Sequence, residues 1–320
     1  MLKNKTIKIL KISSELGAGT RGSSKGFEGL KSAAAMTGSS VFNDYEILSI
    51  KDENDSLLKN ISFPNAKRIQ SIYEVLNRVN KSVHDELIQN HFPILISGDH
   101  SIAMGTIAGI KSAFPNKKIG IVWIDAHADI HTPFTTPSGN MHGMPIAASL
   151  GLDNFSYASN SPKKDVITLW NNIKDLGGDG PNINPKNIVY VGVRDTEWQE
   201  DQTIKKLGIH KCSVEFIRKN GGPKSADTIL NKLEKSDLIY ISFDVDVLDT
   251  SLSTGTGTPV PNGLFLKEVT SLISELSKSE KLCCFEIVEI NPTIDNKGNS
   301  MAEMGLQVLE ALIQSTNITS

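Results

Sequence analysis

Seven apolar segments recur along the chain, and most of them are nearly continuous runs of hydrophobic, mainly β-branched residues. A strand with one exposed face alternates between polar and apolar residues, whereas a strand covered on both faces is apolar throughout. The runs therefore predict buried strands of a mainly parallel sheet that has helices on both faces. They cover residues 6–12, 45–50, 93–96, 119–124, 188–193, 238–245 and 282–290.

Helical patterns lie between most of these segments. In residues 65–90, apolar side chains recur at every third or fourth position, as they do on one face of a helix. Strands that alternate with helices, without an internal repeat or a linker, predict one α/β domain over residues 1–320. Further helices are predicted at 102–113, 199–207, 226–233, 266–276 and 302–313.

Residues 153–187 interrupt the alternation of strands and helices. This segment is rich in Asn, Lys, Gly and Pro, with one amphipathic piece around residues 166–176. It is long for a loop in a compact domain, so we expect an excursion on the surface. The excursion could lie near a functional face, or it could be an ordinary surface insertion.

Composition excludes several classes of protein. Lys and Arg number 33 against 36 Asp and Glu, a net charge of −3, so the basic surface that nucleic acids and anionic membranes require is missing. No apolar stretch suits a signal peptide or a membrane helix. The three cysteines, two of them adjacent, do not make a disulfide framework. We therefore expect a soluble, cytoplasmic protein that acts on a small molecule.

Ionisable residues follow three of the predicted strands at the point where each strand ends. They lie in the segments SGDHS (97–101), DAHADIH (125–131) and DVDVLD (244–249). Such groups are costly to bury unless they are paired or bound to metal, and the carboxyl ends of parallel strands form the ligand crevice of an open α/β sheet. Alternate residues of a strand face the same way, so the side chains of each cluster point together if the strand persists.

The three clusters together predict a site for two metal ions. Their mixed oxygen and nitrogen ligands suit divalent first-row ions such as Mn²⁺, Co²⁺, Fe²⁺ or Zn²⁺, and the lack of thiolates disfavours structural zinc. Two ions ~3.5–4 Å apart would share a carboxylate and could turn a bridging water into hydroxide. Any one cluster alone would carry little weight. The candidate ligands are His100, Asp125, His127, Asp129, Asp244 and Asp246.

Two further segments offer groups for proton transfer and for substrate binding. His142 lies in a turn-rich loop after the second cluster and is a candidate proton shuttle, because an unperturbed imidazole has a pKa near ~6.5. The same loop could also be an ordinary surface turn. Glu286 and Glu289 are an odd number of residues apart, so in a regular strand only one of them would reach the crevice. That carboxylate could bind a cationic substrate or form an ordinary salt bridge.

The assembled pattern resembles the arginase (ureohydrolase) family. The matching segments are SGDHS, DAHADIH, SGNMHG (138–143), SFDVD (242–246), GTPV (257–260) and EIVEINP (286–292), and SELGAGTRG (14–22) resembles a bacterial subgroup. The resemblance implies a three-layer α/β/α fold around an eight-stranded, mainly parallel sheet. It also implies assembly as a trimer or hexamer, and hydrolysis of L-arginine to L-ornithine and urea by a hydroxide that bridges two metal ions.

The resemblance also implies roles for individual residues. Asp125 and Asp244 would bridge the ions, with His100 and Asp129 completing one site and with His127 and Asp246 completing the other. Mn²⁺ is the expected ion, and Co²⁺ is the alternative. Asp129 would hold the hydroxide and pass its proton to the departing amine, His142 would shuttle protons, and Glu289 would orient the guanidinium. The substrate would also contact His131, Thr136, Ser138, Asn140, Glu197, Glu200 and Thr258.

Two alternatives to arginine hydrolysis are left open. His131 stands where many arginases have Asn, and Glu197 where many have Asp. In an agmatinase or a guanidino-acid ureohydrolase, the groups expected to read the amino-acid head group would be idle. A metal-stabilised protein that binds arginine without hydrolysing it is the second alternative. The zinc deacetylases, which are more distant in fold, need only one metal ion.

Overall fold

A computed structural model describes residues 5–316 of the chain. It contains an eight-stranded sheet in the order β2-β1-β3-β8-β7-β4-β5-β6, and every pairing within it is parallel. The predicted sheet is therefore confirmed. Its strands are β1 (Thr6–Ile12), β2 (Glu46–Ile50), β3 (His91–Ser97), β4 (Ile119–Ile124), β5 (Ile188–Val191), β6 (His210–Cys212), β7 (Leu238–Asp244) and β8 (Leu282–Val288).

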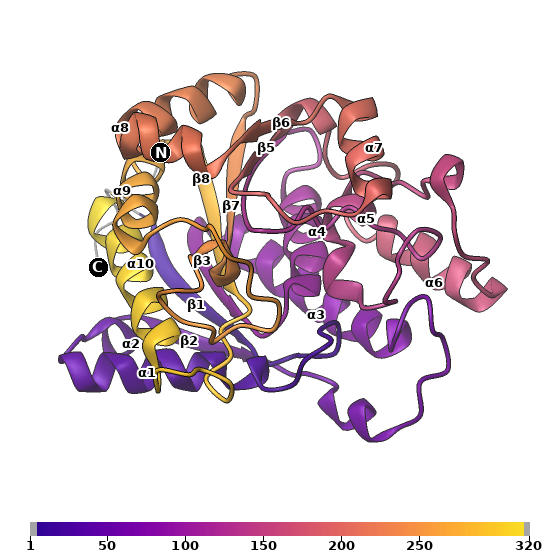
Figure 1. Cartoon of the computed structure of the whole chain (residues 1–320), viewed down its shortest axis with the longest axis horizontal. Coiled ribbons are helices and arrows are strands. Elements are labelled where there is room, and N and C mark those ends of the chain that lie inside the picture. Colours follow the sequence, from indigo (N-terminus) through magenta and orange to yellow (C-terminus); the bar gives the residue numbers. More distant parts are fainter. Residues whose placement is uncertain (1–4, 317–320) are drawn as a thin grey trace.

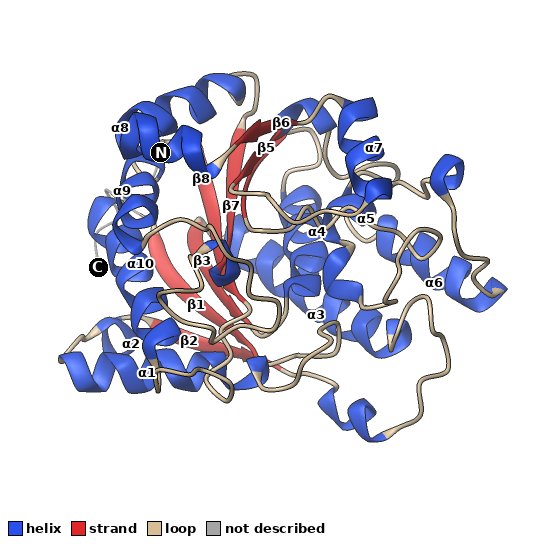
Figure 2. Ribbon diagram, viewed as in Figure 1, coloured by secondary structure: helices blue, strands red, loops and turns tan. Residues whose placement is uncertain are grey.

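Helices cover both faces of the sheet, which gives three layers (Figures 1 and 2). One face is covered by α1 (Gly26–Thr37), α2 (Val41–Asp44), α8 (Val214–Lys232), α9 (Leu266–Leu276) and α10 (Ser300–Ser315). The other face is covered by α3 (Ile69–Ile88), α4 (Ala103–Ala113), α5 (Pro145–Ser149), α6 (Lys164–Lys174) and α7 (Trp198–Leu207).

The continuous apolar runs are explained by two hydrophobic cores, one on each face of the sheet. In β4, Val122 and Ile124 pack into one core, while Ile121 and Trp123 pack into the other. Successive side chains of a strand point to opposite faces. A strand between two helical layers must therefore be apolar at every position.

The prediction from the sequence missed or shortened the elements whose apolar periodicity is weakest. The edge strand β6 has only three residues, HKC, which is too short to show a period. Helix α1, rich in Ala and Gly, was not predicted. Helix α8 begins twelve residues before the predicted start. The prediction began too late because Gly221 (φ 70°) and Pro223 interrupt the helical pattern within α8.

The excursion at 153–187 packs against the domain through α6. Val166, Trp170 and Ile173 on this helix are buried, and the Trp170 indole Nε1 donates to the Leu152 carbonyl oxygen at 3.2 Å. The amphipathic piece predicted there is thus a docked helix. Among the described residues, no helix is long and apolar enough to cross a membrane.

Candidate active site

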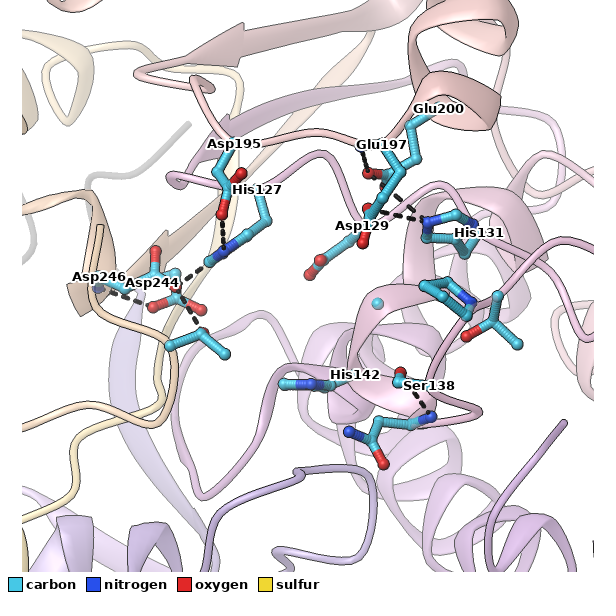
Figure 3. Close-up of a pocket in the computed structure, with 15 residues that line it drawn as sticks. His127, Asp129, His131, Ser138, His142, Asp195, Glu197, Glu200, Asp244 and Asp246 are labelled. Carbon is cyan, nitrogen blue, oxygen red and sulfur yellow. Dashed lines mark hydrogen bonds and ion pairs between the residues drawn. The ribbon is translucent and has the colours of Figure 1, made fainter. Parts of the chain in front are cut away.

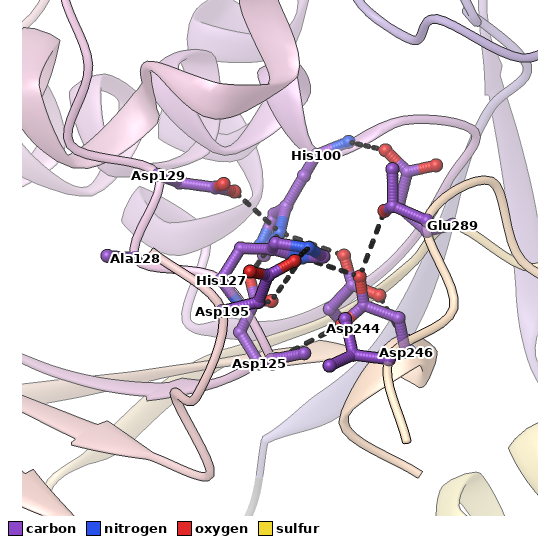
Figure 4. A network of polar contacts seen from close by, with 12 residues as sticks. His100, Asp125, His127, Ala128, Asp129, Asp195, Asp244, Asp246 and Glu289 are labelled. Carbon is purple, nitrogen blue, oxygen red and sulfur yellow. Dashed lines mark hydrogen bonds and ion pairs between the residues drawn. The ribbon is translucent and has the colours of Figure 1, made fainter. Parts of the chain in front are cut away.

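The predicted metal ligands lie together at the carboxyl ends of the central strands. His100 begins a short 3-10 helix (His100–Ile102) after β3, Asp125 follows β4, and Asp244 is the last residue of β7. These strands lie close together near the middle of the sheet, in the order β3-β8-β7-β4. Parallel strands place their carboxyl ends at one edge, which is why residues far apart in sequence meet there (Figure 4).

One group of ligands surrounds the His100 imidazole. Its Nδ1 lies 3.1 Å from Asp125 Oδ2, 3.2 Å from Asp129 Oδ2 and 3.2 Å from Asp244 Oδ2. This nitrogen is buried and has no hydrogen-bond partner. One buried ring nitrogen and three carboxylate oxygens together form a donor set that suits a divalent first-row cation.

A second group adjoins the first through Asp125. His127 Nδ1 lies 2.9 Å from Asp246 Oδ2 and 3.5 Å from Asp125 Oδ1. Asp125 therefore presents one oxygen to each group, as a carboxylate shared by two ions would. Asp244 contacts His100 through Oδ2, whereas its Oδ1 accepts the backbone N–H of Asp246 at 2.8 Å.

The ligands converge although the strands do not persist through them. β4 ends at Ile124, and Asp125 Oδ1 accepts the His127 backbone N–H at 2.6 Å. Asp129 has a left-handed backbone, with φ 50°. The strand therefore does not persist through the cluster, and a turn stabilised by Asp125, rather than the alternation of a strand, brings the three side chains together.

Burial and neighbouring charges shift the pKa values of the candidate metal ligands. Burial opposes the charge of both imidazoles, but neighbouring carboxylates outweigh it, so that the pKa values of His100 and His127 lie well above their usual range. Burial and the charge of Asp125 raise the pKa of Asp129 to about 6. Burial and nearby carboxylates raise the pKa of Asp244 as well. Cations that bind here must displace protons.

Trp123 supports the first group in a way that the sequence did not reveal. Its indole Nε1 donates to Asp125 Oδ2 at 2.9 Å. Its ring stacks on the His100 imidazole, with ring centroids 4.0 Å apart. In the sequence this residue is one more apolar side chain of β4, and no signal there separates it from its neighbours.

A pocket of about 280 Å³ opens above the metal ligands. Figure 3 shows its wall, with His127 and Asp246 on one side and His131 and Glu197 on the other. Each residue predicted to contact the substrate, apart from Glu289, lines this pocket. The pocket residues among the predictions are His131, Thr136, Ser138, Asn140, Glu197, Glu200 and Thr258, together with His142 and the ligands His127, Asp129, Asp244 and Asp246.

One end of the pocket carries a fixed cluster of His131, Glu197 and Glu200. His131 Nδ1 lies 3.0 Å from Thr135 Oγ1, and its Nε2 lies 3.0 Å from Glu197 Oε2. Glu197 caps α7, and its backbone N–H donates to Glu200 Oε2 at 3.1 Å. The hydrogen bond from His131 lowers the pKa of Glu197 to about 2, whereas burial raises that of Glu200 well above its usual range.

Asn140 and the hydroxyl residues of the pocket are held by local hydrogen bonds. Ser138 Oγ accepts the Asn140 backbone N–H at 3.1 Å, and Thr136 Oγ1 accepts that of Gly139 at 2.9 Å. Thr258 Oγ1 donates to Asp246 Oδ2 at 3.2 Å. These contacts hold the loop in shape, and the Ser138 hydroxyl proton is not used in the contact with Asn140.

Glu289 reaches the site because its backbone departs from the strand. β8 ends at Val288, and Glu289 has φ 64°. Its Oε1 accepts the His100 backbone N–H at 3.1 Å and lies 3.0 Å from His142 Nδ1. Its Oε2 is buried and unpartnered. Burial opposes the charge of His142, but Glu289 outweighs it and raises the pKa of His142 to about 9.

Two more residues at the site were not among the site residues predicted from the sequence. Asp195 Oδ2 lies 3.6 Å from His127 Nε2, and Asp195 lines the pocket. Lys67 Nζ donates to Asn140 Oδ1 at 2.9 Å. Both residues lie in loops, Lys67 after the polar segment that follows β2 and Asp195 between β5 and α7. Asp195 stands in the same segment as Glu197 and Glu200, which the family resemblance singled out, whereas Lys67 carried no sequence signal.

Comparisons with known proteins find similar chains over nearly the whole length. The profile of the arginase family matches residues 5–314. The arginase of Brevibacillus brevis is 30% identical over 317 residues, which cover 97% of this chain and 98% of the relative. The arginase of Entamoeba histolytica is 36% identical over 234 residues, 73% of each chain. The Bacillus caldovelox arginase structure matches with a TM-score of 0.81 at 30% identity, over 96% of this chain and 98% of that one.

Proposed function

Because the chain belongs to the arginase family, we propose that it hydrolyses L-arginine to L-ornithine and urea at a site for two divalent metal ions. The carrying observation is the pair of ligand groups that share Asp125 at the base of the pocket. A similar Entamoeba histolytica arginase structure is a complex with L-ornithine; it has a TM-score of 0.81 at 28% identity and covers 97% of this chain and 98% of that one.

The ligand groups suit two ions. His100, Asp125, Asp129 and Asp244 would hold one, and His127, Asp125, Asp244 and Asp246 the other. Such ions, when bound, lower the pKa of a water so that it can act as a nucleophile near neutral pH. Mn²⁺ is the proposed ion and Co²⁺ the alternative, since these ligand types accept either.

Three side chains would serve the guanidinium and the protons. The unpartnered Oε2 of Glu289 would accept a guanidinium N–H, which places the substrate carbon toward the ligand groups. Asp129, whose carboxylate faces both the first ligand group and the pocket, can take the proton of the attacking water and give it to the departing amine. His142, with a pKa of about 9, is protonated at neutral pH and can exchange protons between the pocket and solvent.

The opposite end of the pocket would read the amino-acid head group. Glu197 stays ionised and can bind an α-ammonium group. The Ser138 hydroxyl, and the Asn140 amide that Lys67 contacts, would meet the α-carboxylate. A buried polar site rejects a substrate that lacks the matching group, because its own polar atoms are then left unpaired.

This arrangement predicts a preference for arginine over agmatine. We expect kcat/KM for arginine to exceed that for agmatine by about 10²-fold or more, since agmatine lacks the α-carboxylate. The measurement is urea release from each substrate by metal-stripped protein reloaded with Mn²⁺ or with Co²⁺. Faster agmatine turnover at low concentration would contradict the assignment, and arginine binding without urea from either substrate would indicate a non-catalytic binding protein.

Metal binding is expected to strengthen as the pH rises. In the metal-free protein, the raised pKa values of His100 and His127 keep both imidazoles protonated at neutral pH, and Asp129 takes a proton below about pH 6. Each of these protons must leave when a metal ion binds. Affinity measured by chelator competition, and urea release at limiting metal, should both increase from pH 6 to 9. A flat profile for both would contradict these ligand assignments.

Assembly as a trimer or hexamer is a further part of the proposal, and it rests on the family resemblance. Light scattering of the purified, metal-loaded protein tests it directly. A monomer of 34.8 kDa at micromolar concentration would contradict it.

A further inference from the structure

Glu286 is a fully buried carboxylate that the proposed reaction does not use. It lies in β8, which is otherwise apolar, and is 0% exposed. Its oxygens accept hydrogen bonds from Ser97 Oγ at 2.6 Å and from Tyr240 OH at 2.5 Å. A carboxylate so deeply buried is costly unless it accepts such bonds. Its position next to the metal ligands therefore calls for a role.

A chain of hydroxyl groups joins Glu286 to His100. In the sheet, Glu286 pairs with Ser242 of β7. Ser242 Oγ lies 2.7 Å from His100 Nε2. Tyr240 lies two residues before Ser242 on the same face of β7, where its hydroxyl interacts with that of Ser242, and its own O–H donates to Glu286. We call these four residues, His100, Ser242, Tyr240 and Glu286, the buried relay.

The acceptor at the end of the relay sets the direction of its hydrogen bonds. Both Glu286 oxygens act as acceptors, one for Ser97 and one for Tyr240, so the Tyr240 proton points to Glu286. The Tyr240 oxygen is then left as the acceptor for the neighbouring Ser242 hydroxyl, and the Ser242 oxygen as the acceptor for an N–H at Nε2 of His100. When a metal ion displaces the Nδ1 proton, the neutral imidazole keeps its one remaining proton on Nε2, and the Nδ1 lone pair is free to bind the ion. This is the nitrogen that faces Asp125, Asp129 and Asp244.

We propose that Glu286, acting through Tyr240 and Ser242, is a positioning residue that holds His100 in the tautomer whose Nδ1 can bind a metal ion. With the relay reversed, Ser242 would donate to Nε2 and the imidazole proton would sit on Nδ1, where it excludes a cation. Partners on the far nitrogen of a metal-binding histidine commonly orient the ring in this way. The inference rests on the proposed metal site.

The relay acts on one of the two ligand groups. The contacts of His127 are with Asp125, Asp246 and Asp195, and none of these residues belongs to the relay. A loss of the relay should therefore weaken the ion held by His100 and spare the ion held by His127. General damage to the fold would weaken both ions together.

The experiment compares metal binding by the full chain and its variants after removal of metal. The variants are Tyr240→Phe, which removes one oxygen, Glu286→Gln, which leaves one acceptor oxygen for two donors, and the double variant. Glu86→Gln is the matched control. Glu86, in α3, is also a buried carboxylate, and it accepts from His91 Nδ1 at 2.6 Å. His91 begins β3, at the end of the strand opposite to the metal ligands. Chelator competition with Mn²⁺ and with Co²⁺ gives the affinity of each ion.

We expect one of the two ions to bind about 10–100-fold more weakly in Tyr240→Phe and in Glu286→Gln. The other ion, and both ions in the Glu86→Gln control, should bind as in the unchanged protein. The double variant should lose no more than the larger single loss, because both changes break the same relay. If Glu286→Gln fails to fold, Tyr240→Phe alone decides the question.

Unchanged affinity for both ions in Tyr240→Phe would overturn the relay. So would equal weakening of both ions, or losses that add in the double variant. The proposed function can fail separately. An unchanged protein that binds two ions and releases no urea from any guanidino substrate would refute catalysis, and the binding data would still decide the relay.

Discussion

Replacing Asp129 with Asn is expected to lower kcat for arginine by about 10²–10⁴-fold, the range that a positioned proton-transfer group contributes. Asp129 Oδ2 lies 3.2 Å from His100 Nδ1, and the side chain also lines the pocket. The amide removes both an anionic ligand and the group that accepts the proton of the attacking water. Steady-state urea release at saturating Mn²⁺, with metal content measured on the same sample, tests this expectation.

Asp85→Asn is the control for the Asp129 variant. Asp85 is an exposed carboxylate on α3 that pairs with Lys81 and His84, so its loss should leave kcat unchanged. Turnover by Asp129→Asn close to that of the unchanged protein would refute both roles of Asp129. A large loss of kcat with two ions still bound would assign the effect to the proton rather than to the metal.

The fold could be predicted where residues of one kind repeat. The six residues of β4 are buried between two cores, and that environment leaves a continuous apolar run in the sequence. β6 is a three-residue edge strand with the pattern HKC, so its place in the sheet depends on backbone pairing with β5. Any sequence can form backbone hydrogen bonds, so β6 left no apolar run in the sequence. The apolar runs therefore predicted only seven of the eight strands.

The site could be predicted where strand ends alone bring residues together. His100, Asp125 and Asp244 follow or end three central strands, and their convergence needs only a parallel sheet. The positions of Asp129 and Glu289 depend on left-handed backbone at φ 50° and φ 64°, which no local residue pattern announced. For these two residues, the predicted roles came from the family resemblance, because the strand pattern alone did not predict their positions.

Strand order is the other information that the sequence did not carry. The contact of Tyr240 with Glu286 exists because β7 pairs with β8, although 46 positions separate the two residues. In sequence, Tyr240 is one more apolar strand residue, and Glu286 is one of two carboxylates of which only one was expected to reach the crevice. Only the pairing of the strands shows that the two residues form one polar layer behind the metal ligands.

Replacing Glu289 with Gln is expected to lower kcat/KM for arginine by about 10²–10⁴-fold, because breaking a buried ion pair costs about 3–5 kcal/mol. Its Oε2 is buried and unpartnered, so in the proposed complex a guanidinium would supply the missing donor. An amide at this position has half the acceptors, no charge, and an NH₂ group that repels a guanidinium. Steady-state kinetics with arginine, together with metal content, is the measurement.

The Glu289 variant separates substrate binding from metal binding. Glu289 contacts the backbone N–H of His100 and the ring of His142, and neither contact uses an atom proposed to hold a metal ion. Two ions per chain should therefore remain in Glu289→Gln, in contrast to Asp129→Asn. The pKa of His142 should fall, because Glu289 is the main group that raises it. Loss of a metal ion in this variant, or kinetics with arginine close to those of the unchanged protein, would contradict the role of Glu289 as the guanidinium partner.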